Sequence, residues 1–372
     1  MSSSEPIRVA HIMGKMHGGG VESVVMNYYR HIDRSHVQFD FLVDEDSTIV
    51  PRNEIESLGG CVFPIPPYQQ LTRYMDEIEG LFYREGWQVV HSHINSLSVF
   101  PLRAAKRANV PVRIAHSHSS TGKGERLPKL FMKQVLRCGA GVYPTHCIAC
   151  GELAGRWLFG EGRYKVFRNA IDLGHFAYSP VARKQIRDKL GIPDDCFLVG
   201  HVGRFSPPKN QKWLSGVLNL LLQKVPNTRL VFVGEGPDRL ADKAYFEAAG
   251  QSSSVMFAGQ CPDSAPWYSA FDAFVLPSLY EGLPLVAVEA QRSGLPCVFS
   301  DRVTREVEVS DRVDFLSLND CEVWADVLAS YAVGNQPREL SGHDPRFAGY
   351  DIDVAAPRLV DFYLKVLKEA RS

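Results

Sequence analysis

The stretch Phe197-Leu-Val-Gly-His-Val-Gly203 decides the fold, because it restarts a pattern that the chain has already completed once. The first buried-strand pattern is Ile7-Arg-Val-Ala-His-Ile12, and a glycine-rich loop and a helical pattern follow it. Similar apolar runs occur at residues 39–43, 89–93, 112–116 and 146–150, then at 229–234, 255–258, 273–276 and 296–300. Strands that alternate with helices indicate βαβ units. The sequence therefore predicts an α/β protein with two parallel, doubly wound sheets.

The boundary between the two halves is predicted near residues 173–180, just before a polar helical pattern. We expect one domain over residues 1–175 and a second over residues 176–353. Apolar spacing in the tail predicts a helix over residues 354–370, which completes the first domain. A length of 372 residues also suits two domains better than a single core.

Composition excludes several classes of protein. With 45% hydrophobic and 22% charged residues, the chain is neither disordered nor collagen-like. The net charge of -1 points to no charged partner. Because no apolar run of about 18 residues and no secretory signal occur, we expect a cytoplasmic protein with reduced thiols. Cys147 and Cys150 lie close in sequence, but on a strand they face opposite ways, which disfavours a metal or redox site.

Three motifs carry candidate chemistry, and the first is the glycine run Gly18-Gly19-Gly20 between the first strand and its helix. Backbone N–H groups of such a loop can approach an anion at a helix N-terminus, where the helix dipole also favours negative charge. The run matches neither the Walker pattern nor a dinucleotide fingerprint. A tight turn without a ligand explains it equally well.

The second motif, Gly203-Arg204-Phe205 with Lys209, opens the second half in the same position. It places two cations at the carboxyl edge of a parallel sheet, where open α/β folds bind ligands. Arginine can hold a phosphate with two hydrogen bonds, while lysine acts as a point charge. The alternative is a solvated basic turn.

The third motif is the most specific: Pro277-Ser-Leu-Tyr-Glu281-Gly282-Leu283-Pro284-Leu-Val-Ala-Val-Glu289. It leads from a buried strand into a helix, with Glu281 in the loop and Glu289 about two helical turns further on. Ionised carboxylates accept hydrogen bonds only, so they suit sugar and ribose hydroxyls. Otherwise Glu281 would merely cap the helix.

In this order and at this spacing, the three motifs together with Gly234-Glu235-Gly236-Pro237 resemble family 4 of the retaining glycosyltransferases. The likeness is greatest to bacterial enzymes that build capsular or exopolysaccharide. It covers nearly the whole chain and implies the GT-B fold, with two facing Rossmann-like domains and an active site in the interdomain cleft. The first domain would bind the acceptor and the second the nucleotide sugar.

The resemblance also implies residue roles. Arg204 and Lys209 would hold the diphosphate, Glu281 would touch the donor sugar, and Glu289 would hold the ribose. The other donor-binding candidates are loop residues, namely Gly19, Gly20, Gly203, Gly234, Gly236, Gly282, Leu283 and Pro284. No cofactor and no metal are expected, because the nucleotide diphosphate sugar is a substrate and protein cations replace a metal ion.

Histidines form a further candidate. The family places one histidine after a first-domain strand, close to the transferred sugar, and here that strand ends His116-Ser-His118. Either His116 or His118 fits, and either would otherwise be a core histidine. A similar pair, His91-Ser-His93, ends the strand before it, and for His91 the core interpretation is favoured.

Residues 123–137 interleave basic and apolar side chains, a pattern typical of a segment that lies on an anionic membrane. A solvated helix with a core-facing stripe would show the same pattern. Related transferases dock on the membrane to reach lipid-linked acceptors, so the protein would be peripheral on the inner membrane face.

Together these motifs predict a retaining, metal-independent transferase. It would move a hexose or N-acetylhexosamine from a UDP-linked sugar to a hydroxyl of a growing, lipid-linked glycan. Two rival interpretations are a nucleotide-sugar epimerase of related fold and a non-catalytic sugar-nucleotide-binding partner of a synthesis complex. The epimerase would need acid/base carboxylates in the cleft and does not explain the pair of Glu281 and Glu289 as well.

Overall fold

The computed structural model describes residues 5–118, 127–334, 338 and 344–372. The chain divides into two compact units, Met1–Ala170 with Gly349–Ser372, and Ile171–Ala348. The chain thus leaves the first unit at Ala170, where the sequence placed the boundary at residue 175, and the C-terminal helix belongs to the first unit.

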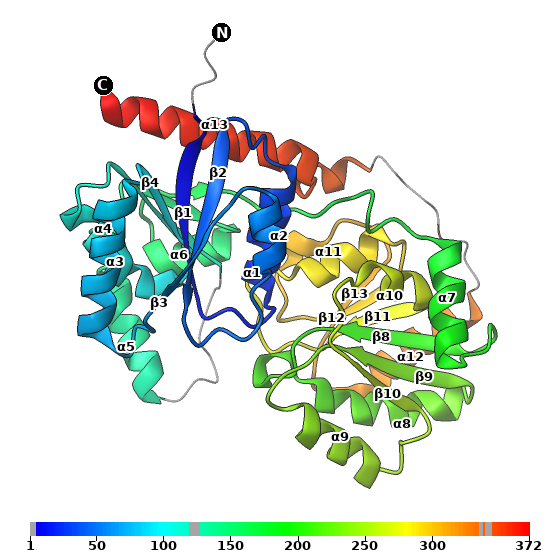
Figure 1. Ribbon diagram of the computed structural model, residues 1–372. Helices are drawn as coiled ribbons and strands as arrows, with labels where there is room; N and C mark the ends of the chain where they lie inside the picture. Colours follow the sequence, from blue (N-terminus) through cyan, green and yellow to red (C-terminus); the bar gives the residue numbers. More distant parts are fainter. Residues whose placement is uncertain (1–4, 119–126, 335–337, 339–343) are drawn as a thin grey trace. The chain divides into compact units, whose positions relative to one another are not determined.

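Unit 1 is built on a seven-stranded parallel sheet in the order β3-β2-β1-β4-β5-β6-β7 (Figure 1). Its strands are β1 (Ile7–Gly14), β2 (Val37–Asp44), β3 (Val62–Ile65), β4 (Val89–Ser92), β5 (Val112–Ser117), β6 (His146–Ala149) and β7 (Lys165–Val166). Its helices are α1 (Gly20–His31), α2 (Arg52–Ser57), α3 (Leu71–Glu85), η1 (Asn95–Ser98), α4 (Val99–Arg107), α5 (Leu127–Cys138), α6 (Glu152–Phe159) and α13 (Ile352–Arg371).

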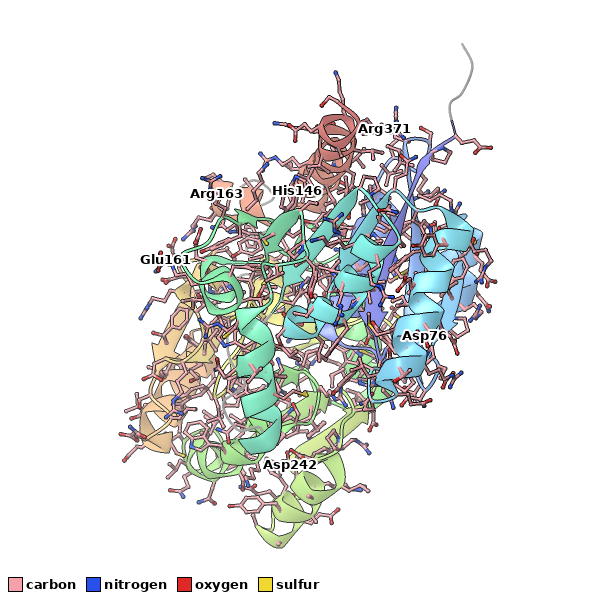
Figure 2. The ribbon with its side chains drawn as sticks, turned by 90° about the vertical axis from the view of Figure 1, so that its left-hand side faces the viewer. Asp76, His146, Glu161, Arg163, Asp242 and Arg371 are labelled. Carbon is pink, nitrogen blue, oxygen red and sulfur yellow. The ribbon has the colours of Figure 1, made fainter. Side chains whose placement is uncertain are left out.

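The two faces of this sheet are covered differently. Side chains such as Ala10, Ile12 and Val90 point into an apolar cluster with α3 and α4. The opposite face lies against α1 and α13, which pack on each other. In β6, the strand next to the edge, the ring of His146 lies 5.8 Å from that of Phe362 in α13, the helix that continues to Arg371 (Figure 2). The C-terminal helix α13, together with α1, therefore covers the face of the sheet that is turned away from α3.

Unit 2 holds a six-stranded parallel sheet in the order β10-β9-β8-β11-β12-β13. Its strands are β8 (Phe197–Val202), β9 (Thr228–Val233), β10 (Val255–Gly259), β11 (Ala273–Leu276), β12 (Cys297–Ser300) and β13 (Val313–Leu316). Its helices are α7 (Pro180–Leu190), η2 (Pro207–Lys209), η3 (Gln211–Trp213), α8 (Leu214–Lys224), α9 (Arg239–Ala248), α10 (Ala265–Ala270), α11 (Leu285–Arg292), η4 (Arg305–Val307) and α12 (Cys321–Val333), while η5 (Pro345–Gly349) lies between the units. Phe232, Leu218 and Trp324 belong to its main core cluster.

The two parallel, Rossmann-like sheets confirm the predicted α/β class. The sequence missed the strands β3, β7 and β13, which have two to four residues each and lie at sheet edges or beside them. Such short runs carry little periodicity, which explains the omission. In the described part of the chain, no helix is long and apolar enough to cross a lipid bilayer.

Candidate functional site

Loops at the carboxyl ends of three strands meet in unit 2. β8 lies between β9 and β11, so the direction of sheet growth reverses at β8, the position where open α/β sheets bind ligands. The backbone N–H of Leu279 donates to the carbonyl of Pro208 at 2.7 Å, and the Asn210 amide donates to the carbonyl of Pro277 at 3.3 Å. These bonds join the second and third sequence motifs into one site.

An ion pair forms the centre of this site. Lys209 Nζ donates to Glu281 Oε1 at 2.6 Å, and the side chains are only 18% and 13% exposed. The Ser278 hydroxyl donates to the same carboxylate oxygen at 2.7 Å. Because both side chains are largely removed from water, each charged group holds the other in place. Glu281 is therefore more than a helix-capping group.

Arg204 differs from Lys209 in that its side chain is exposed. Its backbone is fixed, because its carbonyl accepts a hydrogen bond at 2.9 Å from the amide of the buried Gln211. Among the described residues, no carboxylate forms an ion pair with its guanidinium. Arg204 is thus a positioned cation that can bind an anion with two parallel hydrogen bonds.

The glycines of this site bring two loop backbones into direct contact. Gly234 has a φ of +142°, and a Cβ there would lie 2.2 Å from the carbonyl oxygen of Gly203. Gly236 has a φ of +158°, and its Cβ would lie 2.2 Å from the carbonyl oxygen of Phe205. A side chain at Gly234 or Gly236 would push the loops apart. The glycines are needed to hold the loop that carries Arg204.

Glu289 follows Glu281 in the sequence and lies in α11, where it accepts a hydrogen bond from the Tyr268 hydroxyl at 2.7 Å. Burial raises the pKa of Glu289 to about 7, against the lowering effect of the Tyr268 hydrogen bond. His175 and Asp263, which also influence Glu289, pair with each other at 2.8 Å. Glu289 can therefore accept hydroxyl hydrogen bonds as a carboxylate, but only near or above neutral pH.

In the glycine loop of unit 1, the backbone N–H groups bind a side chain of the protein itself. The Glu22 carboxylate accepts hydrogen bonds from the backbone N–H groups of His17 at 2.8 Å and Gly19 at 2.9 Å, and also from Gly18. The N–H groups that the sequence assigned to a ligand anion thus bind an internal carboxylate. A Cβ at Gly20 would meet no atom within 4 Å, so this glycine leaves open space at the start of α1.

His116 and His118 lie at the end of β5 and are 6% and 8% exposed. His91 Nε2 lies 3.2 Å from His116 Nδ1, and His93 Nδ1 lies 2.9 Å from His118 Nε2. The backbone N–H of His118 also donates to Asn95 Oδ1 at 2.8 Å. Both candidates therefore belong to one cluster of buried imidazoles, which includes His91.

The comparisons with known proteins show the family of the chain. The C-terminal part, residues 196–331, matches the family model "Glycosyl transferases group 1", and residues 19–197 match "Glycosyl transferase 4-like domain". The putative glycosyltransferase EpsF of Bacillus subtilis is 36% identical over 98% of this chain and 97% of its own length. The chain belongs to the group 1 glycosyl transferases.

More distant relatives of this glycosyltransferase include the capsular polysaccharide biosynthesis glycosyltransferase CapH of Staphylococcus aureus, 23% identical over 96% of this chain and 99% of CapH. A UDP-Gal:alpha-D-GlcNAc-diphosphoundecaprenol alpha-1,3-galactosyltransferase of Escherichia coli is 24% identical, with 88% of each chain covered. Among solved structures, HepE of Anabaena in complex with UDP and glucose has a TM-score of 0.80 at 18% identity, covering 96% of this chain and 99% of HepE. That likeness supports the GT-B fold class.

The structure of this glycosyltransferase thus brings Arg204, Lys209 and Glu281 together with the glycines of unit 2. The sequence missed Ser278 and Tyr268, whose hydroxyls bind the two glutamates. It also missed His201, a buried histidine of β8 whose Nδ1 lies 2.9 Å from the carbonyl oxygen of Val275. Single hydroxyls and a lone histidine within an apolar strand carry no distinctive spacing.

Part of the predicted membrane segment cannot be compared with the structure. Residues 123–126 lie outside the described residues, as do the side chains of 127–131. In the rest of α5 and just after it, Val135 is 55% exposed and Val142 is 61% exposed. Among the described residues, the groups of side chains with metal-ligand spacing include neither Cys147 nor Cys150.

Proposed function

We propose that this glycosyltransferase moves a hexose or N-acetylhexosamine from a UDP-linked sugar to a hydroxyl of a growing, lipid-linked polysaccharide precursor. The observation that carries the proposal is the Lys209–Glu281 ion pair, 2.6 Å long, in the same loop cluster as the exposed Arg204. The E. coli relative is named for a UDP-galactose donor and a diphosphoundecaprenol-linked sugar, and HepE binds UDP and glucose. CapH, which is named for capsular polysaccharide biosynthesis, supports a role in polysaccharide synthesis.

The chemistry follows from the charges. When the glycosidic bond breaks, negative charge collects on the leaving diphosphate while the sugar becomes oxocarbenium-like. Arg204 can bind two phosphate oxygens, and Lys209 adds a point charge nearby. Fixed cations that face the developing charge stabilise the transition state more than the ground state. Glu281, held by Lys209 and Ser278, supplies an acceptor for hydroxyls of the donor sugar.

We further propose that the reaction retains the anomeric configuration and uses no metal ion. The acceptor hydroxyl attacks on the face from which the diphosphate departs, and a phosphate oxygen takes the acceptor's proton. Arg204 and Lys209 do the work that a divalent cation performs in other transferases. Glu289, in its ionised form, accepts hydrogen bonds from the ribose hydroxyls of the nucleotide.

A donor screen followed by a transfer assay tests the proposal. UDP sugars should raise the melting temperature of the protein more than the corresponding GDP or dTDP sugars. With the preferred donor, labelled sugar should pass to a diphospholipid-linked glycan, and the new linkage should keep the donor's anomeric configuration by NMR. Chelators should not reduce the rate.

Variants of two neighbouring lysines sharpen the assay. Lys209→Ala should abolish most transfer, whereas Lys212→Ala, which removes an exposed lysine three residues away, should not. An epimerised nucleotide sugar, or donor binding without any turnover, would contradict a transferase. Activity that depends on added magnesium would contradict the metal-free mechanism.

A further inference from the structure

His201 is a histidine within an apolar strand, β8 of unit 2. It follows Val199 by two residues, so its side chain lies on the sheet face that carries the main core cluster. The ring is fully buried, and its centroid lies 5.8 Å from that of Phe232. Burial of a polar ring is costly unless its nitrogens are hydrogen-bonded. A histidine at this position therefore needs an explanation beyond core packing.

The hydrogen bond at one ring nitrogen fixes the tautomer of His201. Nδ1 lies 2.9 Å from the carbonyl oxygen of Val275, and a carbonyl oxygen can only accept a hydrogen bond. Nδ1 must therefore carry a hydrogen. Burial lowers the pKa of His201 to about 4, so the ring is neutral at pH 7 and has a single N–H. Nε2 is consequently a lone pair that can only accept.

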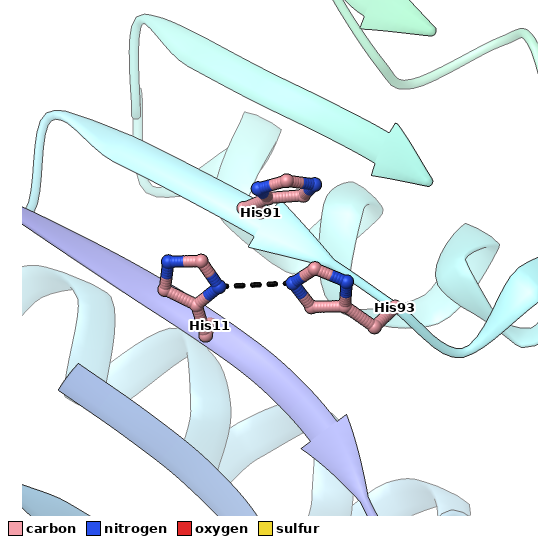
Figure 3. Close-up of side chains that lie close together, drawn as sticks. All are labelled: His11, His91 and His93. Carbon is pink, nitrogen blue, oxygen red and sulfur yellow. Dashed lines mark hydrogen bonds between the residues drawn. The ribbon is translucent and has the colours of Figure 1, made fainter. Parts of the chain in front are cut away.

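His201 Nε2 is buried and has no hydrogen-bond partner within the described part of the chain. Among the described residues of unit 1, five histidines are buried, and their rings contact one another in short chains: His11, His91, His93, His116 and His118. His11 Nδ1, for example, lies 2.9 Å from His93 Nε2 (Figure 3). His201 has no such neighbour. Because a buried acceptor without a donor is uncommon in proteins, its Nε2 calls for a donor that reaches it in another state of the enzyme.

The donor at hand is Lys209, because Nε2 and the lysine stem meet at the space that Gly203 leaves open. A Cβ at Gly203 would lie 3.3 Å from His201 Nε2, and 3.6 Å and 3.7 Å from Cε and Cδ of Lys209. These are the three heavy atoms nearest to that position. The positive charge of Lys209 also lowers the pKa of His201 further. Lys209 ends in an ammonium group with three N–H donors, one bond beyond Cε.

In this structure Lys209 donates to Glu281 at 2.6 Å, and only 18% of the lysine side chain is exposed. In the proposed reaction each member of this pair has a second partner, since Glu281 accepts from the donor sugar and Lys209 faces the diphosphate. When Glu281 turns to the sugar, the ammonium needs another acceptor, because an unpaired charge that is largely removed from water is costly.

A neutral imidazole suits this task better than a second carboxylate. A carboxylate would cancel the charge of Lys209, whereas the lone pair of His201 accepts a hydrogen bond and adds no net charge. The full positive charge of the lysine then remains available to the negative charge that grows on the diphosphate. The hydrogen bond to the carbonyl of Val275 keeps the ring in the tautomer that can accept.

We propose that His201 is a positioning residue for Lys209: its Nε2 lone pair accepts a hydrogen bond from the ammonium group when Glu281 binds the donor sugar. Lys209 thus exchanges one acceptor for another and stays in place for the diphosphate. His201 itself remains buried and touches no substrate. The roles of the sugar and the diphosphate rest on the proposed function, whereas the tautomer of His201 and the exchange of partners by Lys209 do not.

Nitrogen-15 NMR on protein with labelled histidine tests the exchange of partners without substrate, and His201→Phe assigns the signals. In the wild type, Nδ1 should be protonated and Nε2 unprotonated. Glu281→Ala removes the carboxylate from Lys209, so the Nε2 signal should shift as a nitrogen does when it accepts a hydrogen bond. Lys209→Ala in the same protein should cancel the shift. The proposal is wrong if Nε2 is protonated in the wild type, if Glu281→Ala leaves its signal unchanged, or if the shift survives Lys209→Ala.

Two substitutions of His201 separate positioning from core packing. Asparagine places an amide N–H near Nδ1, so it keeps the hydrogen bond to Val275 but offers no acceptor at the place of Nε2. Glutamine is longer, and its amide oxygen can replace Nε2. His201→Asn should lower kcat/KM for the UDP sugar about ten- to hundredfold, the usual effect of losing a hydrogen bond to a charged group, while His201→Gln should recover most of the rate. The reverse order would indicate a role in packing and overturn the proposal.

A double-mutant cycle tests whether His201 acts through Lys209. In the Lys209→Ala protein, His201→Asn should have no further effect on kcat/KM, whereas in Lys212→Ala, at an exposed position, it should keep its full effect. The affinity of His201→Asn for UDP alone should be unchanged, because without a sugar Lys209 stays paired with Glu281. Additive losses in Lys209→Ala, or weaker binding of UDP, would refute the positioning role. If the NMR shifts appear but no UDP sugar is turned over, the proposed function fails and the exchange of partners stands.

Discussion

The polar groups at the carboxyl ends of the two sheets differ in charge. In unit 2, the site is charged: Lys209 and Glu281 pair at 2.6 Å, and Arg204 stands exposed beside them. In unit 1, the corresponding edge carries neutral imidazoles that bind one another, and the internal carboxylate of Glu22 already occupies the glycine loop. Two sheets of the same kind thus support ionic contacts in one unit and uncharged hydrogen bonds in the other.

The charged site of unit 2 matches the charged part of the proposed donor. A diphosphate carries charge that grows on departure, so it needs cations, and unit 2 supplies them. Unit 1 should also respond strongly to pH, because acid protonates histidines in the unfolded chain and so favours unfolding of a unit whose histidines are buried and neutral.

The largest expected effect is the acid sensitivity of unit 1. The five buried histidines have folded-state pKa values below 6.5, so the unfolded state binds more protons as the pH falls, and stability is lost below about pH 6.5. Between pH 7.5 and 5.5 each contributes a loss of about 1 kcal/mol, or roughly 5 to 7 kcal/mol together. Hydrogen exchange resolved by mass spectrometry should show the loss in β1, β4 and β5.

Unit 2 is the internal control. Burial lowers the pKa of His201 to about 4, which destabilises unit 2 in acid, but burial raises that of Glu289 to about 7, which stabilises it there. These two effects oppose each other over the same range of pH. Equal acid sensitivity of β8 and β4 would show that the buried imidazoles are not the cause. His11→Phe should reduce the proton uptake on unfolding, while His36→Asn, at an exposed position, should not.

The second prediction concerns the cations of unit 2. Arg204→Ala and Lys209→Ala should each reduce activity by about 2 to 4 kcal/mol in transition-state stabilisation, because both face the charge that grows on the diphosphate. Circular dichroism should show an intact fold. Lys209→Ala should have the additional effect of leaving Glu281 without its cation, so its donor affinity should fall as well. A change in KM alone, with kcat preserved, would argue against a role in the transition state.

Much of the fold and of unit 2 could be predicted from the sequence. Strand runs such as Ile7–Ile12 show a clear apolar pattern, so the strands themselves could be predicted. The site could be predicted because the carboxyl ends of parallel strands lie along the same edge of a sheet, and its candidate residues follow such strands: Arg204, Lys209, Glu281 and Glu289. The structure places Arg204, Lys209 and Glu281 in one loop cluster, but their roles stay predictions. Short strands such as Lys165–Val166 could not be predicted, because they are strands through their pairing with β6 and not through a local sequence pattern.

The histidine chains could not be predicted for a different reason. The sequence showed the pairs His91-Ser-His93 and His116-Ser-His118, but not that β4 pairs with both β1 and β5, which brings His11 into contact. His91 also contacts the hydroxyl of Tyr363, which lies 272 residues after it in the chain. Similarly, the Glu22 carboxylate accepts a hydrogen bond from the backbone N–H of Gly19 because of how the loop folds. The sequence does not reveal that fold, so the glycine run alone suggested an external anion.

The third prediction separates the two glutamates of unit 2. Because burial raises the pKa of Glu289 to about 7, binding of free UDP should weaken up to tenfold per pH unit below 7, as the carboxylate gains a proton. Tyr268→Phe removes a hydrogen bond that lowers this pKa, so the midpoint should move to higher pH. Glu289→Ala should abolish the pH dependence of UDP binding. Glu281→Ala should instead reduce turnover, and equal, small effects of both changes would defeat the assignment.

The smallest expected effect per residue concerns the membrane segment, residues 123–137. In the described part of this segment Val135 is exposed, two residues before the basic Arg137. If the segment docks on lipid, the protein should bind anionic vesicles and not neutral ones, and salt should weaken the binding, since each basic residue contributes about 1 kcal/mol of screened attraction. A triple variant with Lys123, Lys129 and Lys133 changed to Gln should lose vesicle binding and transfer to a lipid-linked acceptor. It should still hydrolyse a soluble donor, because none of these lysines belongs to the charged site of unit 2. Vesicle binding that survives the triple change would make the segment an ordinary solvated helix, and the acceptor would have to be reached by another surface.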